Sequence, residues 1–117
     1  MSSHITIIDI ERVRGDNYPF YFQILQADGV TPENVTGFSF LMTADPEQDP
    51  PAATNNHFQL TGVVSDGLNG KINFVPSTVN MDLSIDTHYY DVQMTDGTPY
   101  IRTVIRGKLI IEQDITK

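Results

Sequence analysis

The stretch 89-YYDVQMTDGTPYIRTVI-105 decides the fold, because two runs of alternating apolar and polar residues flank one turn signal. Alternation with a period of two places every second side chain on the same face of an extended strand. The apolar positions are Tyr90, Val92 and Met94 in the first run and Ile101 and Ile105, with Thr103 between them, in the second. The Asp96-Gly97 pair between the runs is typical of a tight turn. The stretch therefore predicts a β-hairpin with one face in the core.

The same pattern continues toward the N-terminus. Further alternating runs contain Phe20, Phe22 and Ile24; Phe38, Phe40 and Met42; Phe58, Leu60 and Val64; and Ile72 and Phe74. Turn signals separate these runs at Asp28-Gly29, Asp66-Gly67 and Asn69-Gly70. No segment shows the apolar stripe of an amphipathic helix. The sequence predicts an all-β protein, specifically an immunoglobulin-like antiparallel β-sandwich of about seven to eight strands.

The length of 117 residues corresponds to one domain, and we expect residues 1–117 to form a single β-sandwich. A chain of this size buries roughly 65% of its unfolded surface, which is enough for a core without metal or disulfide support. There is no cysteine, so disulfides and thiolate metal sites are excluded.

The chain carries 15 acidic and 7 basic residues, for a net charge of −8. Such a surface repels phosphate backbones and anionic lipids, so we expect no nucleic-acid or membrane partner. The first residues lack the basic and apolar regions of a signal peptide, and no apolar run approaches the ~20 residues of a membrane span. We therefore expect the protein to be made in the cytoplasm.

Residues with catalytic or metal-binding potential are scattered along the sequence. His4, His57 and His88 each stand alone near the start of an expected strand, without a second ligand at a metal-binding spacing. There is no G-x-S-x-G motif and no phosphate-binding glycine loop. We expect no catalytic residue, no cofactor and no small-molecule substrate.

Acidic side chains gather in two places, which raises the possibility of calcium. One group is Asp45, Glu47 and Asp49, and the other is Asp66, Asn69 and Asp82. Calcium needs six to eight oxygen ligands, and neither group has the central glycine and terminal glutamate of an EF-hand loop. We expect these acids to be solvated and no metal to be bound.

The stretch from Ala44 to Asn56 is rich in proline and polar residues. Such a composition is typical of an exposed loop that buries little apolar surface. We expect this loop to serve as a contact or clamp element with little influence on stability.

Tyr90 stands two residues before Val92, which is expected to point inward. In immunoglobulin-type sandwiches, a tyrosine at this position donates a hydrogen bond back to the preceding turn. The alternative is that Tyr90 is simply a large core side chain.

Several strand and turn motifs resemble those of small phage and prophage tail proteins. They are the opening "ITIIDIERVRGDNYPFYFQILQADGVTPENVTGFSFLMT", followed by "GKINFVPS", "YYDVQM" and "RTVIRGKLIIEQDIT". The nearest family is the N-terminal domain of the siphophage baseplate upper protein, together with stand-alone phage structural proteins like it. The resemblance implies a non-enzymatic virion structural protein, from a tail, baseplate or head-tail junction, that acts as an assembly and attachment module. It implies assembly in the host cytoplasm and partners that are copies of the chain or other virion proteins.

A carbohydrate-binding sandwich from an adhesin or a surface-active enzyme is the main alternative. Such modules stack solvent-facing aromatic rings on sugars. The chain has no tryptophan, and Tyr21 and Tyr100 are the plausible stacking residues. The same two tyrosines could equally pack at a protein interface.

The first and last expected strands are apolar on both faces. Ile5 and Ile7 face opposite to Ile8 and Ile10, and Ile110 faces opposite to its two apolar neighbours. In immunoglobulin-like sandwiches the first strand often lies parallel beside the last. We expect this pairing here, with Ile8, Ile10 and Ile110 outward as a patch that mediates homo-oligomerisation with closed symmetry or docking on another virion protein. The alternative is a monomer in which a loop covers Ile110.

Overall fold

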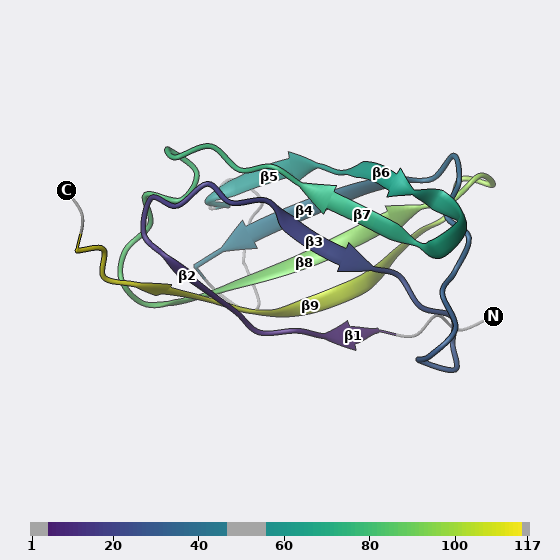
Figure 1. The fold of residues 1–117 in the computed structure, drawn as a ribbon, viewed down its shortest axis with the longest axis horizontal. Helices are drawn as coiled ribbons and strands as arrows, with labels where there is room; N and C mark the ends of the chain where they lie inside the picture. The colour runs from purple at the N-terminus through teal and green to yellow at the C-terminus, as the bar shows by residue number, and fades with distance from the viewer. Residues whose placement is uncertain (1–4, 47–55, 116–117) are drawn as a thin grey trace.

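The computed structural model of the protein describes residues 5–46 and 56–115. These residues form nine β-strands in two sheets, which pack face to face as a β-sandwich. The expected all-β sandwich is therefore confirmed. In Figure 1 the smaller sheet lies across the larger one.

The larger sheet has six strands and the smaller has three. The six-stranded sheet contains β1 (Thr6–Ile7), β2 (Ile10–Val13), β4 (Ser39–Asp45), β5 (Phe58–Thr61), β8 (Thr87–Thr95) and β9 (Ile101–Glu112). Its order is β1-β9-β8-β4-β5, and β2 also pairs with β9. The three-stranded sheet contains β3 (Phe20–Gln23), β6 (Val63–Asp66) and β7 (Lys71–Phe74), in the order β3-β7-β6. A short 3-10 helix, η2 (Gly67–Asn69), joins β6 to β7.

The β8–β9 hairpin is present as expected. The Asp96 side chain closes its turn, because Oδ1 accepts hydrogen bonds from the backbone N–H groups of Thr98 and Tyr100, each at 2.9 Å. The Thr98 hydroxyl also donates to Asp96. The Thr98 hydroxyl bond and the backbone bonds hold the pKa of Asp96 below its usual value. Gly97 does not adopt a positive φ, so this carboxylate rather than a left-handed glycine shapes the turn.

A β-bulge changes which side chains of β9 face the core. Val92 pairs with Ile105, and the residue after Val92 pairs with Thr103, so Val104 is the extra residue. Val104 and Ile105 are both buried, whereas Ile101 is 65% exposed. The expectation that Ile101, Thr103 and Ile105 share the core face is therefore wrong, because the bulge reverses the alternation.

The segment from β5 to β6 passes from one sheet to the other at Gly62. A Cβ atom on Gly62 would lie only 2.9 Å from Phe40 Cβ and from Phe74 Cε1. The close approach of backbone to core aromatics therefore requires glycine at this corner.

The first strands run parallel to the last strand, as expected. β1 and β2 both pair with β9 in parallel, and the other strand pairs are antiparallel. The described strands number nine rather than seven to eight. The number is higher because two apolar runs each form two strands. The first run is divided into β1 and β2, and the second is divided into β5 and β6.

One hydrophobic core fills the space between the sheets. Its largest fully buried side chains are Phe20, Phe74, Met42, Ile72, Met81, Met94, Ile105, Leu109 and Ile111. Most come from the alternating runs, as a half-buried sheet requires. Among the described residues, no helix is long or apolar enough to cross a lipid bilayer.

Candidate functional site

The N-terminal segment crosses β9 at a point where its strand pairing is interrupted. β1 ends at Ile7 and β2 begins at Ile10. Between them, the Ile8 N–H donates to the Arg106 carbonyl at 3.0 Å. The Asp9 carboxylate then accepts a hydrogen bond from the Lys108 N–H, also at 3.0 Å. A side-chain oxygen thus replaces a backbone carbonyl in the ladder.

Gly107 makes this crossing possible. A Cβ atom on Gly107 would lie 2.0 Å from the Ile8 carbonyl oxygen. The backbone of the N-terminal segment therefore occupies the space that any other side chain at position 107 would fill.

Tyr90 completes the crossing from β8. Its hydroxyl donates a hydrogen bond to the Ile8 carbonyl oxygen at 2.6 Å, and its side chain is 4% exposed. Val92 is fully buried, so the inward orientation of both residues is confirmed. The hydroxyl does not bond to the preceding turn, however, and that expectation is wrong. Burial raises the pKa of Tyr90 and Asp9 adds to the shift, so the phenol stays a donor over the whole physiological range.

The expected outward patch has a different composition in the structure. Ile8 and Ile10 are half-buried and pack against the core, so the expectation that they point outward is wrong. The register explains the reversal, since Ile10 pairs with the buried Leu109 in a parallel ladder and shares its face. The outward side chains of this segment are instead Ile5 and Ile7, which are 43% and 67% exposed.

Ile110 lies on the outer face of β9, opposite to its buried neighbours Leu109 and Ile111. Its cross-strand partners are Glu11 on β2 and Thr87 on β8. The side chain is half-buried within this row. Of the three expected patch residues, Ile110 alone faces away from the core.

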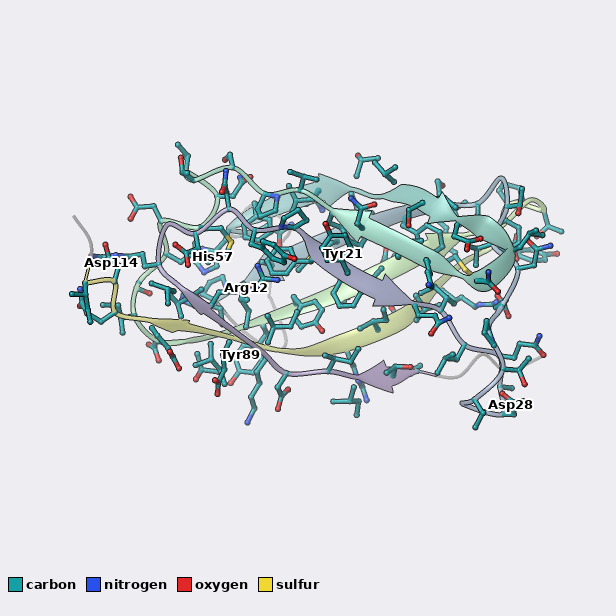
Figure 2. All side chains as sticks on the ribbon, in the orientation of Figure 1. Arg12, Tyr21, Asp28, His57, Tyr89 and Asp114 are labelled. Atoms are coloured by element: carbon teal, nitrogen blue, oxygen red, sulfur yellow. The ribbon has the colours of Figure 1, made fainter. Side chains whose placement is uncertain are left out.

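A shallow groove of about 550 Å³ crosses the outer face of the six-stranded sheet, between β1 and β4. We call it the outer groove. Its apolar and charged lining residues include Ile5, Ile7, Tyr89, Asp9, Asp91, Arg106 and Lys108. Figure 2 labels Tyr89, which lies beside β9. The outer groove thus combines two exposed isoleucines with side chains of both charge signs.

Tyr21 and Tyr100 are both exposed, at 62% and 73%, but they lie on different elements. Tyr21 is on β3 of the three-stranded sheet (Figure 2), and Tyr100 is in the β8–β9 turn. The ring that contacts Tyr21 is Tyr18, with centroids 5.9 Å apart and ring planes at 68°. The structure therefore pairs Tyr21 with a residue that the sequence reasoning did not single out.

His57 and His88 form a pair that the sequence reasoning also missed. His57 Nε2 lies 2.8 Å from His88 Nδ1, and His88 Nε2 lies 2.8 Å from the Ser84 carbonyl oxygen. A carbonyl only accepts, so His88 Nε2 carries a proton and, in a neutral ring, Nδ1 accepts from His57. One feature of the sequence could have revealed this pair, namely that each histidine stands at the start of an expected strand. Both strands, β5 and β8, pair with β4, and this pairing brings their starts together.

The environment of His57 disfavours its charged form. Burial lowers the pKa of His57, the neighbouring His88 lowers it further, and Asp45 opposes the shift. His88 is 2% exposed and Asp45 is 4% exposed, so the expectation that Asp45 is a solvated loop acid is wrong. Polar side chains are thus packed at the end of β4, where the chain leaves the six-stranded sheet.

Within the second acidic group, Asp66 and Asp82 do not come together. Asp66 accepts a hydrogen bond from the Asn69 amide at 2.9 Å, whereas Asp82 lies beside Arg14 and Asp114 at a different surface depression. No cluster of three or more possible metal ligands occurs within residues 5–46 and 56–115. Glu47, Asp49, His4 and most of the loop expected at 44–56 lie outside the described residues.

A comparison with protein families finds no family model that matches the chain, and no curated protein matches it either.

Proposed function

We propose that the protein is a non-enzymatic structural component of a phage virion, which attaches to copies of itself or to other virion proteins through β1 and the outer groove. The motif resemblance to baseplate upper protein N-terminal domains suggests the tail, baseplate or head-tail junction. The negative charge makes nucleic acid and anionic membranes poor partners.

The exposed edge at β1 carries this proposal. β1 is the end strand of the six-stranded sheet, and within the described part of the chain only β9 pairs with it. Ile7 projects outward from this strand and is 67% exposed. Edge strands with outward apolar side chains are templates for association, which monomeric proteins usually protect with charge, proline or a covering loop.

The partner on which we base the test is a second copy of the chain. The outer groove holds Asp9 and Asp91 together with Arg106 and Lys108. A surface that contains both charge signs can face its own copy across a two-fold axis with opposite charges adjacent. In a closed symmetric oligomer, each β1 edge is covered by another copy of the chain. In an open arrangement, one edge would stay free, and further copies would add to it to form a filament.

Sedimentation velocity tests this interface with Ile7→Lys. The variant should keep the β-sheet circular dichroism spectrum, since Ile7 is largely exposed, and should sediment as a monomer where the wild type forms an oligomer. Leu68→Lys is the matched control, because Leu68 is 72% exposed on η2 and lies away from β1. A wild-type chain that is monomeric at high concentration, or an oligomer that both variants leave intact, would contradict the interface.

The virion role has an independent test in the genes that flank the coding sequence. Tail, baseplate or head-completion genes are the expected neighbours. A position among carbohydrate-degrading enzymes or adhesins would instead favour the alternative function.

A further inference from the structure

Two exposed tyrosines, Tyr18 just before β3 and Tyr21 on β3, form a corner of aromatic surface. Tyr18 is 64% exposed and Tyr21 is 62% exposed, and their rings meet at 68° with centroids 5.9 Å apart. A ligand ring stacked on the face of one tyrosine would therefore touch the other tyrosine with its edge. Single exposed aromatics are common on protein surfaces, but two exposed rings in contact with each other call for an explanation.

Arg12 holds this corner in place. Its guanidinium donates to the Tyr18 carbonyl at 2.7 Å and to the Pro19 carbonyl at 3.1 Å. The same group lies 4.4 Å from the centre of the buried Phe20 ring and 5.5 Å from that of Tyr18. The backbone that carries the tyrosines is thus anchored to the core, so a ligand need not order it.

A neutral polar side chain lies beside the corner on the neighbouring strand. Tyr21 pairs across the sheet with Asn73 on β7, and cross-strand neighbours have Cβ atoms about 5 Å apart. Within the described chain, neither the Asn73 amide nor the Tyr18 and Tyr21 hydroxyls make an internal hydrogen bond. They are free to bind hydroxyl groups of a ligand stacked on the rings.

The charge of this strip differs from that of the molecule. β3 and β7 contain no acidic residue, although the chain carries a net charge of −8. The other outward groups on these strands are Gln23 and Lys71. The nearest acidic influence is Asp16, which acts on Arg12 rather than lying on these strands. Aromatic faces beside amide side chains complement the C–H faces and hydroxyls of sugars.

A protein partner fits this strip less well. Added strands need free backbone groups at a sheet edge, and Arg12 already occupies the carbonyls of Tyr18 and Pro19 where the chain enters β3. Stable protein interfaces also need a desolvated apolar centre. Here Gln23, Lys71 and Asn73 flank the tyrosines, and the exposed apolar side chain of Val63 lies one strand further away, as the partner of Asn73 on β6.

We propose that Tyr18, Tyr21 and Asn73 form a binding site for a neutral hexopyranose oligosaccharide, with one sugar ring stacked in the tyrosine corner and its hydroxyls bonded to the Asn73 amide. The site lies on the three-stranded sheet, whereas the proposed assembly surface lies on the six-stranded sheet. The two proposals can therefore fail separately.

Proton–nitrogen correlation NMR of the labelled protein tests the site with three probes: maltohexaose, cellohexaose and chitohexaose. At least one should shift the amide signals of residues 17–23 and 71–75 in a saturable manner. Tyr21→Ala should weaken the apparent affinity by about tenfold, as the loss of one stacking contact predicts. Asn73→Ala should weaken it as well, which provides a second variant that leaves the rings in place.

Tyr100→Ala is the matched control, because it removes an equally exposed tyrosine from the β8–β9 turn and should bind like the wild type. The proposal is overturned if none of the three oligosaccharides shifts these signals, or if the shifts map elsewhere. It is also overturned if Tyr100→Ala abolishes binding while Tyr21→Ala does not. A change in oligomeric state on Tyr21→Ala would show that the strip is a protein interface instead.

Discussion

The single hydrogen bond from Tyr90 to Ile8 joins parts of the chain that are 82 positions apart. Its donor comes from the β8 strand, and its acceptor is a carbonyl in the gap between β1 and β2. Because the carbonyl leans over Gly107, the bond fixes where the N-terminal segment crosses the sheet.

Tyr90→Phe should therefore destabilise the protein by about 1–3 kcal/mol, since the carbonyl loses its partner while the aromatic core remains filled. Urea denaturation measures this as a lower midpoint with an unchanged slope. Tyr89→Phe is the control, because Tyr89 lies on the outer face and makes no hydroxyl bond within the described residues. Equal stabilities for the two variants would show that the bond contributes nothing.

The His57–His88 pair predicts a pH dependence of stability. The folded pKa of His57 is lowered, chiefly by burial, below the unfolded value of about 6.5. The unfolded chain then binds the proton more readily, so stability present above about pH 6.5 is lost as the pH falls toward the folded pKa.

Urea denaturation at pH 8 and at pH 5.5 measures the effect, with His57→Gln as the comparison. Glutamine retains an amide donor near the Nε2 position but does not titrate, so the variant should lose less stability on acidification than the wild type. Parallel losses in the two proteins would assign the pH dependence to other groups.

At the scale of elements, the β8–β9 hairpin and the parallel first strand follow from the sequence, but their registers do not. Alternation shows that a strand has two faces, and it identifies the core face only when the other face is polar. The N-terminal segment is apolar on both sides, so the sequence could not show that Ile8 and Ile10 point inward. The bulge at Val104 was ambiguous for a related reason. Val104 and Ile105 are adjacent and both apolar, so the sequence does not show which of them continues the alternation.

The candidate surfaces depend even more on pairing between distant strands. Ile110 was placed correctly on the outer face because its two neighbours are plainly core residues. The contact between His57 and His88 and that between Tyr21 and Asn73 arise from sheet register. Register of this kind cannot be derived from one sequence without knowing which strands are neighbours.

Gly107→Ala tests the crossing of β1 and β2 over β9. The added methyl would lie 2.0 Å from the Ile8 carbonyl oxygen, so the N-terminal segment must move or detach. We expect a loss of more than about 2 kcal/mol in unfolding free energy, because backbone cannot yield as a flexible side chain does. Gly97→Ala is the control, since a Cβ there meets nothing within 4 Å and the φ is not positive. Similar stability of the two variants would mean that the crossing is not closely packed.

On the scale of the whole molecule, one continuous core holds the two sheets together. Ion pairs add little, since Arg14–Asp114 and Arg102–Glu33 are both partly exposed. The sandwich is stabilised by apolar burial and by backbone pairing between strands that are distant in sequence.

Chelation should therefore leave the stability unchanged. Thermal unfolding with and without EDTA should give the same melting temperature, because neither acidic group offers a complete set of oxygen ligands. A decrease of several degrees that added calcium reverses would reveal a metal site.

The parallel pairing of β1 and β2 with β9 also determines how the domain responds to force. Pulling β1 toward its N-terminal end and β9 toward its C-terminal end moves the two strands in opposite directions along their shared axis. The hydrogen bonds between them, together with those of Asp9 and Tyr90 at the crossing, are then loaded at the same time in shear rather than broken one after another. The fold therefore resists extension between the ends of its first and last strands by loading these hydrogen bonds together.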